Sequence, residues 1–83
     1  MRLLLVYDIV HDGTRAKIAD ICQDYGLDRI QYSAFEGPLV RAQQKELVSK
    51  MKRQLGNRPG NIQLWPICER DWAQRQVIEN KRE

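Results

Sequence analysis

Three segments of the chain have the apolar pattern of β-strands. Residues 2–9 are a short run of apolar, β-branched and aromatic side chains that ends at a turn signal, as in a central strand buried on both faces. Residues 29–37 alternate and predict one strand, or a strand bent into two pieces. The side chains expected together on one face of it are Ile30, Tyr32 and Ala34. Residues 61–68 predict a last strand, and Pro66 puts it at a sheet edge or ends it, because proline has no N–H to donate.

Two other segments have apolar positions at helical spacing. Residues 14–25 predict a helix that Asp12 or Thr14 can cap and that Gly26 can end. Its apolar positions are Ile18, Ile21, Cys22 and Tyr25. Residues 40–55 predict a second helix. The inner stripe of this helix consists of Val40, Gln44, Leu47, Val48, Met51 and Leu55.

The order of these elements predicts an α+β fold. A ferredoxin-like βαββαβ sandwich, with an antiparallel sheet covered by two helices, is the most economical layout. Residues 1–68 form the core domain, and residues 69–83 form a polar C-terminal tail, expected to pack as a short strand or turn on a neighbouring subunit. The helices leave one sheet face uncovered and the core of an 83-residue chain is small, so we expect a homodimer.

Composition indicates the class of protein and the cellular compartment, and the cysteine spacing bears on a zinc site. The chain is 42% hydrophobic and 30% charged, which is typical of a globular protein. Cys22 and Cys68 have no zinc-ligand spacing and are expected to be two buried thiols in a reducing cytoplasm. The apolar N-terminal segment is too short for a membrane span or a signal peptide, so we expect a cytoplasmic protein.

Charge is distributed unevenly along the chain. Residues 1–40 carry four Arg or Lys against six Asp or Glu, a net charge of −2, whereas residues 41–83 carry ten against five, a net charge of +5. The basic residues of the second helix fall on its outer face: Arg41, Lys45, Lys50, Lys52 and Arg53. This face is either a surface for a polyanion such as nucleic acid or an ordinary solvated face.

Asp8 is the main candidate for chemistry, because it is a lone carboxylate at the end of the predicted central strand. It is either a functional acid or a carboxylate that caps the loop or helix that follows. Arg15 and Lys17 lie in the first turn of the next helix, where cations are unfavourable for the helix dipole, so they are either solvated or compensated by a bound anion. His11 is either a free loop histidine or a general base.

Several of these residues together resemble a known family. The Leu-Val-Tyr7-Asp8-Ile9 run, the Arg15-x-Lys17 pair and the segment Tyr-Gly-Leu-Asp-Arg-Ile-Gln-Tyr-Ser-Ala-Phe-Glu-Gly at residues 25–37 are similar to the small CRISPR-associated Cas2 ("Cas two") proteins. The resemblance covers roughly residues 1–67. The chain departs from the family in having lysine at position 17, where arginine is common; lysine keeps the charge but loses the bidentate fork.

The resemblance implies a homodimer with a metal site at its interface. It also implies work in spacer acquisition beside the larger Cas1 integrase and, in some members, magnesium-dependent cleavage of single-stranded RNA or double-stranded DNA. Asp8 would then be both catalytic and metal-binding, with one Mg²⁺ shared by two Asp8 side chains across the two-fold axis, because a single aspartate is a poor magnesium site. The nucleic-acid-binding residues predicted on this basis are Arg15, Lys17, Arg29, Arg41, Lys45 and Lys52.

Two functions stay open at this point. One is a metal-dependent endonuclease with Asp8 at its centre. The other is a non-catalytic dimeric adaptor that binds double-stranded DNA along the basic second helix and bridges integrase subunits. A generic RNA-binding module is disfavoured, because the second strand lacks the paired exposed aromatic side chains that stack bases in such domains. The presence of Asp8 does not distinguish the endonuclease from the adaptor, because folding and dimerisation alone would require this residue in either.

Overall fold

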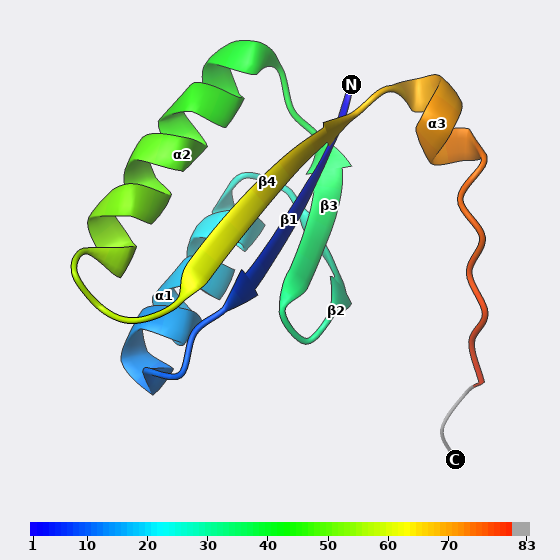
Figure 1. Ribbon diagram of the computed structural model, residues 1–83. Coiled ribbons are helices and arrows are strands. Elements are labelled where there is room, and N and C mark those ends of the chain that lie inside the picture. Colours follow the sequence, from blue (N-terminus) through cyan, green and yellow to red (C-terminus); the bar gives the residue numbers. More distant parts are fainter. Residues whose placement is uncertain (81–83) are drawn as a thin grey trace.

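Four strands of the chain form one antiparallel sheet, in the order β2-β3-β1-β4 (Figure 1). The computed structural model describes residues 1–80. In chain order the elements of this part are β1 (Arg2–Asp8), α1 (Asp12–Asp24), β2 (Asp28–Gln31), β3 (Ala34–Pro38), α2 (Arg41–Leu55), β4 (Asn61–Ile67) and α3 (Glu69–Ala73). The first six elements give the predicted ferredoxin-like βαββαβ arrangement, with β1 in the centre and β4 at an edge.

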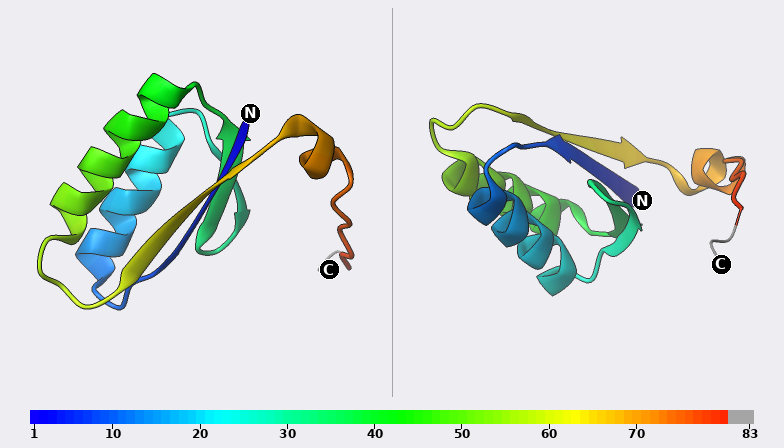
Figure 2. Two further views of the ribbon diagram at one scale, coloured as in Figure 1. Left: turned by 45° about the horizontal axis from the view of Figure 1, so that its top comes forward. Right: turned by 90° about the horizontal axis from the view of Figure 1, so that it is seen from below.

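Helices α1 and α2 lie side by side on one face of the sheet (Figure 2). Side chains alternate along a strand, and Leu3, Leu5 and Tyr7 of β1 point toward the helices and are buried. From the other elements, the core receives Ile18, Cys22, Phe35, Leu47 and Met51, among others. Leu4 and Val6 point to the opposite face and are only half-buried. In this single chain, the prediction that the strand is buried on both faces is therefore wrong.

The segment at residues 29–37 is a hairpin, the second of the two predicted alternatives. Its turn consists of Tyr32 and Ser33, and the pairing of β2 with β3 is irregular between Arg29 and Gln31. Ala34 is in register with Val6 and so lies on the sheet face opposite the helices, whereas Tyr32, in the turn, lies beside Arg15 of α1. The expectation that these three side chains share one face is wrong for this reason.

Helix α2 packs through fewer residues than its pattern predicts. Leu47 and Met51 are buried, but Val40 precedes the helix as its N-cap residue and is exposed. The helix ends where predicted, at Gly56, whose φ of 55° is a backbone conformation that favours glycine.

No helix within the described residues is long and apolar enough to cross a membrane.

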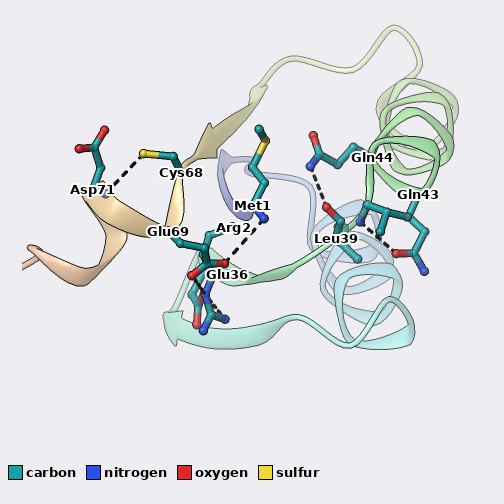
Figure 3. A network of polar contacts seen from close by, with 10 residues as sticks. Met1, Arg2, Glu36, Leu39, Gln43, Gln44, Cys68, Glu69 and Asp71 are labelled. Carbon is teal, nitrogen blue, oxygen red and sulfur yellow. Dashed lines mark hydrogen bonds and ion pairs between the residues drawn. The ribbon is translucent and has the colours of Figure 1, made fainter.

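The C-terminal tail begins with the short helix α3, where a strand or turn was expected. Arg2 connects α3 to the sheet: its Nε lies 3.7 Å from Glu69 Oε2 and its Nη1 lies 3.5 Å from Glu36 Oε2 (Figure 3). The Arg2 guanidinium also lies 5.8 Å from the centre of the Trp72 ring. Residues 74–80 form no helix or strand, and residues 81–83 of the predicted tail lie outside the described residues. Packing of the tail on a neighbouring subunit stays a prediction.

The two cysteines differ in environment, although both were expected to be buried. Cys22 is fully buried in α1, and burial raises the pKa of its thiol to about 12. Cys68 is exposed, and its Sγ accepts a hydrogen bond from the N–H of Asp71 at the start of α3 (Figure 3). The prediction is wrong for Cys68, because β4 has ended at that point and the chain turns out into solvent.

We therefore expect the two thiols to react at very different rates. Iodoacetamide near pH 8 should modify one thiol per native chain and two after unfolding in urea, as counted by mass spectrometry, because a thiol with a pKa near 12 stays protonated and Cys22 is inaccessible. Cys68→Ser should abolish the fast reaction and Cys22→Ser should leave it unchanged. Rapid modification of both thiols in the native chain would contradict this assignment.

Candidate nuclease site

Asp8 lies at the C-terminal end of the central strand, as predicted, and its side chain is exposed. Because Tyr7 points into the core, Asp8 points to the uncovered face, on which Leu4 and Val6 also lie. Its partner in β4 is Asn61. The residue before Asn61 is Gly60, where an added Cβ would lie 2.8 Å from the carbonyl oxygen of Asp8, so this close approach requires glycine. The fold therefore fixes the backbone at Asp8 while leaving its carboxylate open.

Helix α1 is capped by His11 and not by Asp8, Asp12 or Thr14. The Nδ1 of His11 accepts a hydrogen bond of 3.1 Å from the N–H of Thr14 and lies 2.9 Å from the Thr14 hydroxyl. His11 is thus not a free loop histidine, because its Nδ1 caps α1. A role for it as a general base stays a prediction. Within residues 1–80, the Asp8 carboxylate has neither a hydrogen bond nor an ion pair, so it does not cap the following loop or helix.

Arg15 is held by the loop that follows β1. Its Nη1 donates to the carbonyl oxygens of Ile9 and Val10 at 3.1 and 3.3 Å, and its Nη2 donates to the Asp12 carboxylate. The hydrogen bond that Arg15 donates to the Asp12 carboxylate is the main cause that raises the pKa of Arg15. Most of the Arg15 guanidinium is therefore used within the chain. Of the two alternatives, solvation or compensation by a bound anion, neither describes Arg15, because Asp12 supplies the compensating negative charge.

Arg29 and Tyr32 lie beside Arg15 at the β2–β3 hairpin. The guanidinium carbon of Arg29 lies 5.0 Å from the centre of the Phe35 ring and 5.9 Å from that of Tyr32, and the corresponding carbon of Arg15 lies 5.8 Å from the Tyr32 ring. Phe35 is fully buried and stacks on Tyr7, so it belongs to the core. Among the described residues, Arg29 has no hydrogen-bonded partner, so its N–H groups are available to a ligand.

The remaining predicted contacts are spread over the two helices. Lys17 is exposed on α1, outside this cluster. Arg41, Lys45 and Lys52 are exposed on α2 at spacings of four and seven, which puts them on one helix face. Helix α2 runs from the Pro38 end of β3 to the loop before Asn61, so Lys52 lies toward the Asp8 end of the sheet and Arg41 toward the opposite end (Figure 1). The structure thus brings Arg15 and Arg29 together around Tyr32, on the sheet face that the helices cover, and leaves Arg41 apart from them.

One chain alone does not supply a magnesium site. Within residues 1–80, no group of three or more His, Cys, Asp or Glu side chains is placed to hold a metal ion. A single exposed carboxylate is a weak donor set, since Mg²⁺ is held by one or two carboxylates together with other oxygen ligands and waters. The residues present would fit such an ion only if a second copy brought its own Asp8.

Comparison with known proteins identifies the family. Residues 1–75 match the model of the family described as CRISPR associated protein Cas2. The chain belongs to the Cas2 family. It is 41% identical over 81 residues to "CRISPR-associated endoribonuclease Cas2 2" of Chloroflexus aurantiacus, an alignment that covers 98% of this chain and 95% of the relative.

Two further relatives of the Cas2 chain bear on partners and on fold. A "CRISPR-associated endonuclease Cas1/endonuclease Cas2 fusion" of Thermoproteus tenax is 40% identical over 70 residues, covering 84% of this chain and 26% of the fusion. The crystal structure of Streptococcus pyogenes Cas2 at pH 6.5 superposes with a TM-score of 0.81 at 19% identity, covering 95% of this chain and all of that one. This structural likeness supports the ferredoxin-like fold alone.

If Asp8 has no structural partner, neutralising it should leave stability intact. We expect Asp8→Asn to leave the free energy of unfolding unchanged or slightly raised, whereas His11→Ala, which removes the N-cap of α1, should lower it by about 1 kcal/mol. Urea unfolding followed by circular dichroism measures both changes. A loss in Asp8→Asn as large as that in His11→Ala would show that the carboxylate has a structural role.

Proposed function

We propose that this Cas2 protein is a metal-dependent nuclease of CRISPR spacer acquisition. It works as a homodimer in which two Asp8 carboxylates share one divalent cation, Mg²⁺ or a similar metal. The observation that carries the proposal is the carboxylate of Asp8: it is exposed, has no partner among the described residues and points to the sheet face that the helices do not cover. The "endoribonuclease" in the name of the Chloroflexus relative supports a nuclease.

Pairing of the uncovered faces would complete the site. This face carries Leu4 and Val6, both half-buried, and Trp65, which is paired with Leu4 across β1 and β4 and is exposed. Burying these apolar side chains against a second copy would add to the stability of a small core. A two-fold axis passing near the ends of the two β1 strands would then bring the Asp8 side chains together.

Within the dimer, each part of the site has a distinct role. The bound cation would supply an activated water and a counter-charge for the phosphate in the transition state. The two Asp8 side chains would hold it. Arg29, with its N–H groups free, would bind the phosphate backbone, whereas Arg15 would keep the loop after β1 in place.

Cleavage of labelled single-stranded RNA and duplex DNA over a range of Mg²⁺ concentrations tests the proposal. Wild type should cut only with the metal, and Asp8→Asn should lower kcat by roughly 100-fold or more, because it removes several kcal/mol of transition-state stabilisation. Asp24→Asn, which neutralises another exposed carboxylate on α1, is the matched control and should cut like wild type. Equal cleavage by Asp8→Asn and wild type would contradict the role of Asp8.

A second candidate function is a DNA-binding adaptor for Cas1. The Thermoproteus fusion supports it, because its name joins Cas1 and Cas2 in one chain, and so does the basic face of α2. In this case the protein would lay α2 along double-stranded DNA and bridge two integrase subunits without cutting.

Charge reversal separates the adaptor from the nuclease. We expect the triple variant Arg41→Glu, Lys45→Glu and Lys52→Glu to weaken duplex DNA binding and to reduce its salt dependence by about 0.9 in log–log slope for each lost phosphate contact. A variant with the same charge change at Arg58, Arg70 and Arg75 is the control. The adaptor predicts that spacer acquisition in cells survives Asp8→Asn and fails in the first triple variant; the reverse result would exclude it.

A further inference from the structure

A hollow of about 320 Å³ lies between α1 and the β2–β3 hairpin. Ala16 and Ala19 of α1 form a smooth wall, Tyr32 stands opposite, and Asp20, Gln23 and Arg29 provide polar groups. The volume is at the lower end of the range for small-molecule sites. The hollow lies at the same end of the sheet as Asp8, since Tyr32 belongs to the hairpin turn beside the end of β1 (Figure 1).

Tyr32 is held in place although 69% of it is exposed. The backbone of the turn is fixed to β1, because the N–H of Tyr7 donates to the carbonyl oxygen of Ser33 at 3.0 Å and the hydroxyl of Tyr7 donates to that of Tyr32 at 3.5 Å. Arg15 and Arg29 lie at the outer limit for cation–π contacts with the ring. The backbone at Tyr32 is thus fixed, and neither guanidinium is closely stacked on its exposed ring.

The charges around the hollow favour a neutral occupant. Arg15 is paired with Asp12, which leaves one cation, Arg29, and one carboxylate, Asp20, without partners among the described residues. A phosphate inside the hollow would be repelled by the negative charge of the Asp20 carboxylate. A flat neutral group with hydrogen-bonding edges would stack on Tyr32 and bond with Asp20 and Gln23 instead.

We propose that this hollow is a subsite for one unpaired nucleobase of a bound strand. Tyr32 is its stacking platform, Arg29 binds the adjoining phosphate at the rim, and Asp20, which accepts hydrogen bonds only, selects bases with an exocyclic amino group. The subsite rests on the proposed function in one respect, namely that the ligand of this end of the sheet is a nucleic acid. It explains why an aromatic side chain is held beside two arginines in the turn.

Fluorescence anisotropy with single-stranded oligo(C) and oligo(U) RNA tests the subsite. The measurements are made in EDTA, so that no cleavage intervenes. The two probes are matched in size, but cytosine has a donor N4 amino group where uracil has an acceptor oxygen. Tyr32→Ala should weaken binding of oligo(C) by roughly 5- to 150-fold, and Tyr32→Phe, which keeps the ring, should stay within about twofold of wild type. Wild type should prefer oligo(C), and Asp20→Asn should lose the preference while the control Asp24→Asn keeps it.

The outcomes distinguish this subsite from the nuclease proposal. If Asp8→Asn fails to alter cleavage while Tyr32→Ala weakens binding as expected, the nuclease site is wrong and the subsite stands. Equal Kd values for wild type and Tyr32→Ala overturn the subsite, as does a wild type that binds no single strand. An equal loss of affinity by Tyr32→Ala on an abasic RNA would also overturn it, because the side chain would then act on the backbone and not on a base.

Discussion

The alternation of side chains along β1 is the constraint on which the rest of the structure depends. This strand is paired on both sides, with β3 and β4, and its inward side chains Leu3, Leu5 and Tyr7 form the centre of the core. A shift of the register by one residue would turn all three into solvent and direct Asp8 against the helices, where a charge without a partner is costly. The core therefore fixes the direction in which the Asp8 carboxylate points.

The end of β1 also positions the hairpin that carries Tyr32. Tyr7 is buried, yet its N–H and its hydroxyl bond to the Ser33 and Tyr32 carbonyl groups of the turn. Adjacent residues of one strand thus serve opposite sides of the sheet, with Asp8 on the uncovered face and Tyr7 under the hairpin. A strand of nucleic acid that occupied both the hollow and the Asp8 site would have to pass around this end of the sheet, and Arg29, in the hairpin, is placed to bind its backbone there.

The topology could be predicted from the sequence because it depends on the periodicity of buried positions. The strands predicted at residues 2–9 and 61–68 and the helix predicted at residues 14–25 display this periodicity clearly. The hairpin at residues 28–38 was harder, since its turn is Tyr32-Ser33 and lacks the Gly, Asn or Asp that usually mark two-residue connections. Without this turn, the alternation places Tyr32 on the same sheet face as Ala34, and the hollow between Tyr32 and α1 could not be predicted. The cap by His11 and the short helix α3 have weak local signals, because histidine and cysteine are not usual N-cap residues.

The position of Asp8 could be predicted, but the division of work between the arginines could not. Both Arg15 and Arg29 were candidates for binding a phosphate, and nothing in their spacing separates them. The difference arises where the loop after β1 turns its Ile9 and Val10 carbonyl oxygens toward α1, so that Arg15 satisfies them together with Asp12. Arg29, held only by contact with aromatic rings, keeps its hydrogen-bond donors. Arg15, which is paired within the fold, therefore fixes the loop beside Asp8. Arg29, whose hydrogen-bond donors have no partner among the described residues, can bind the ligand.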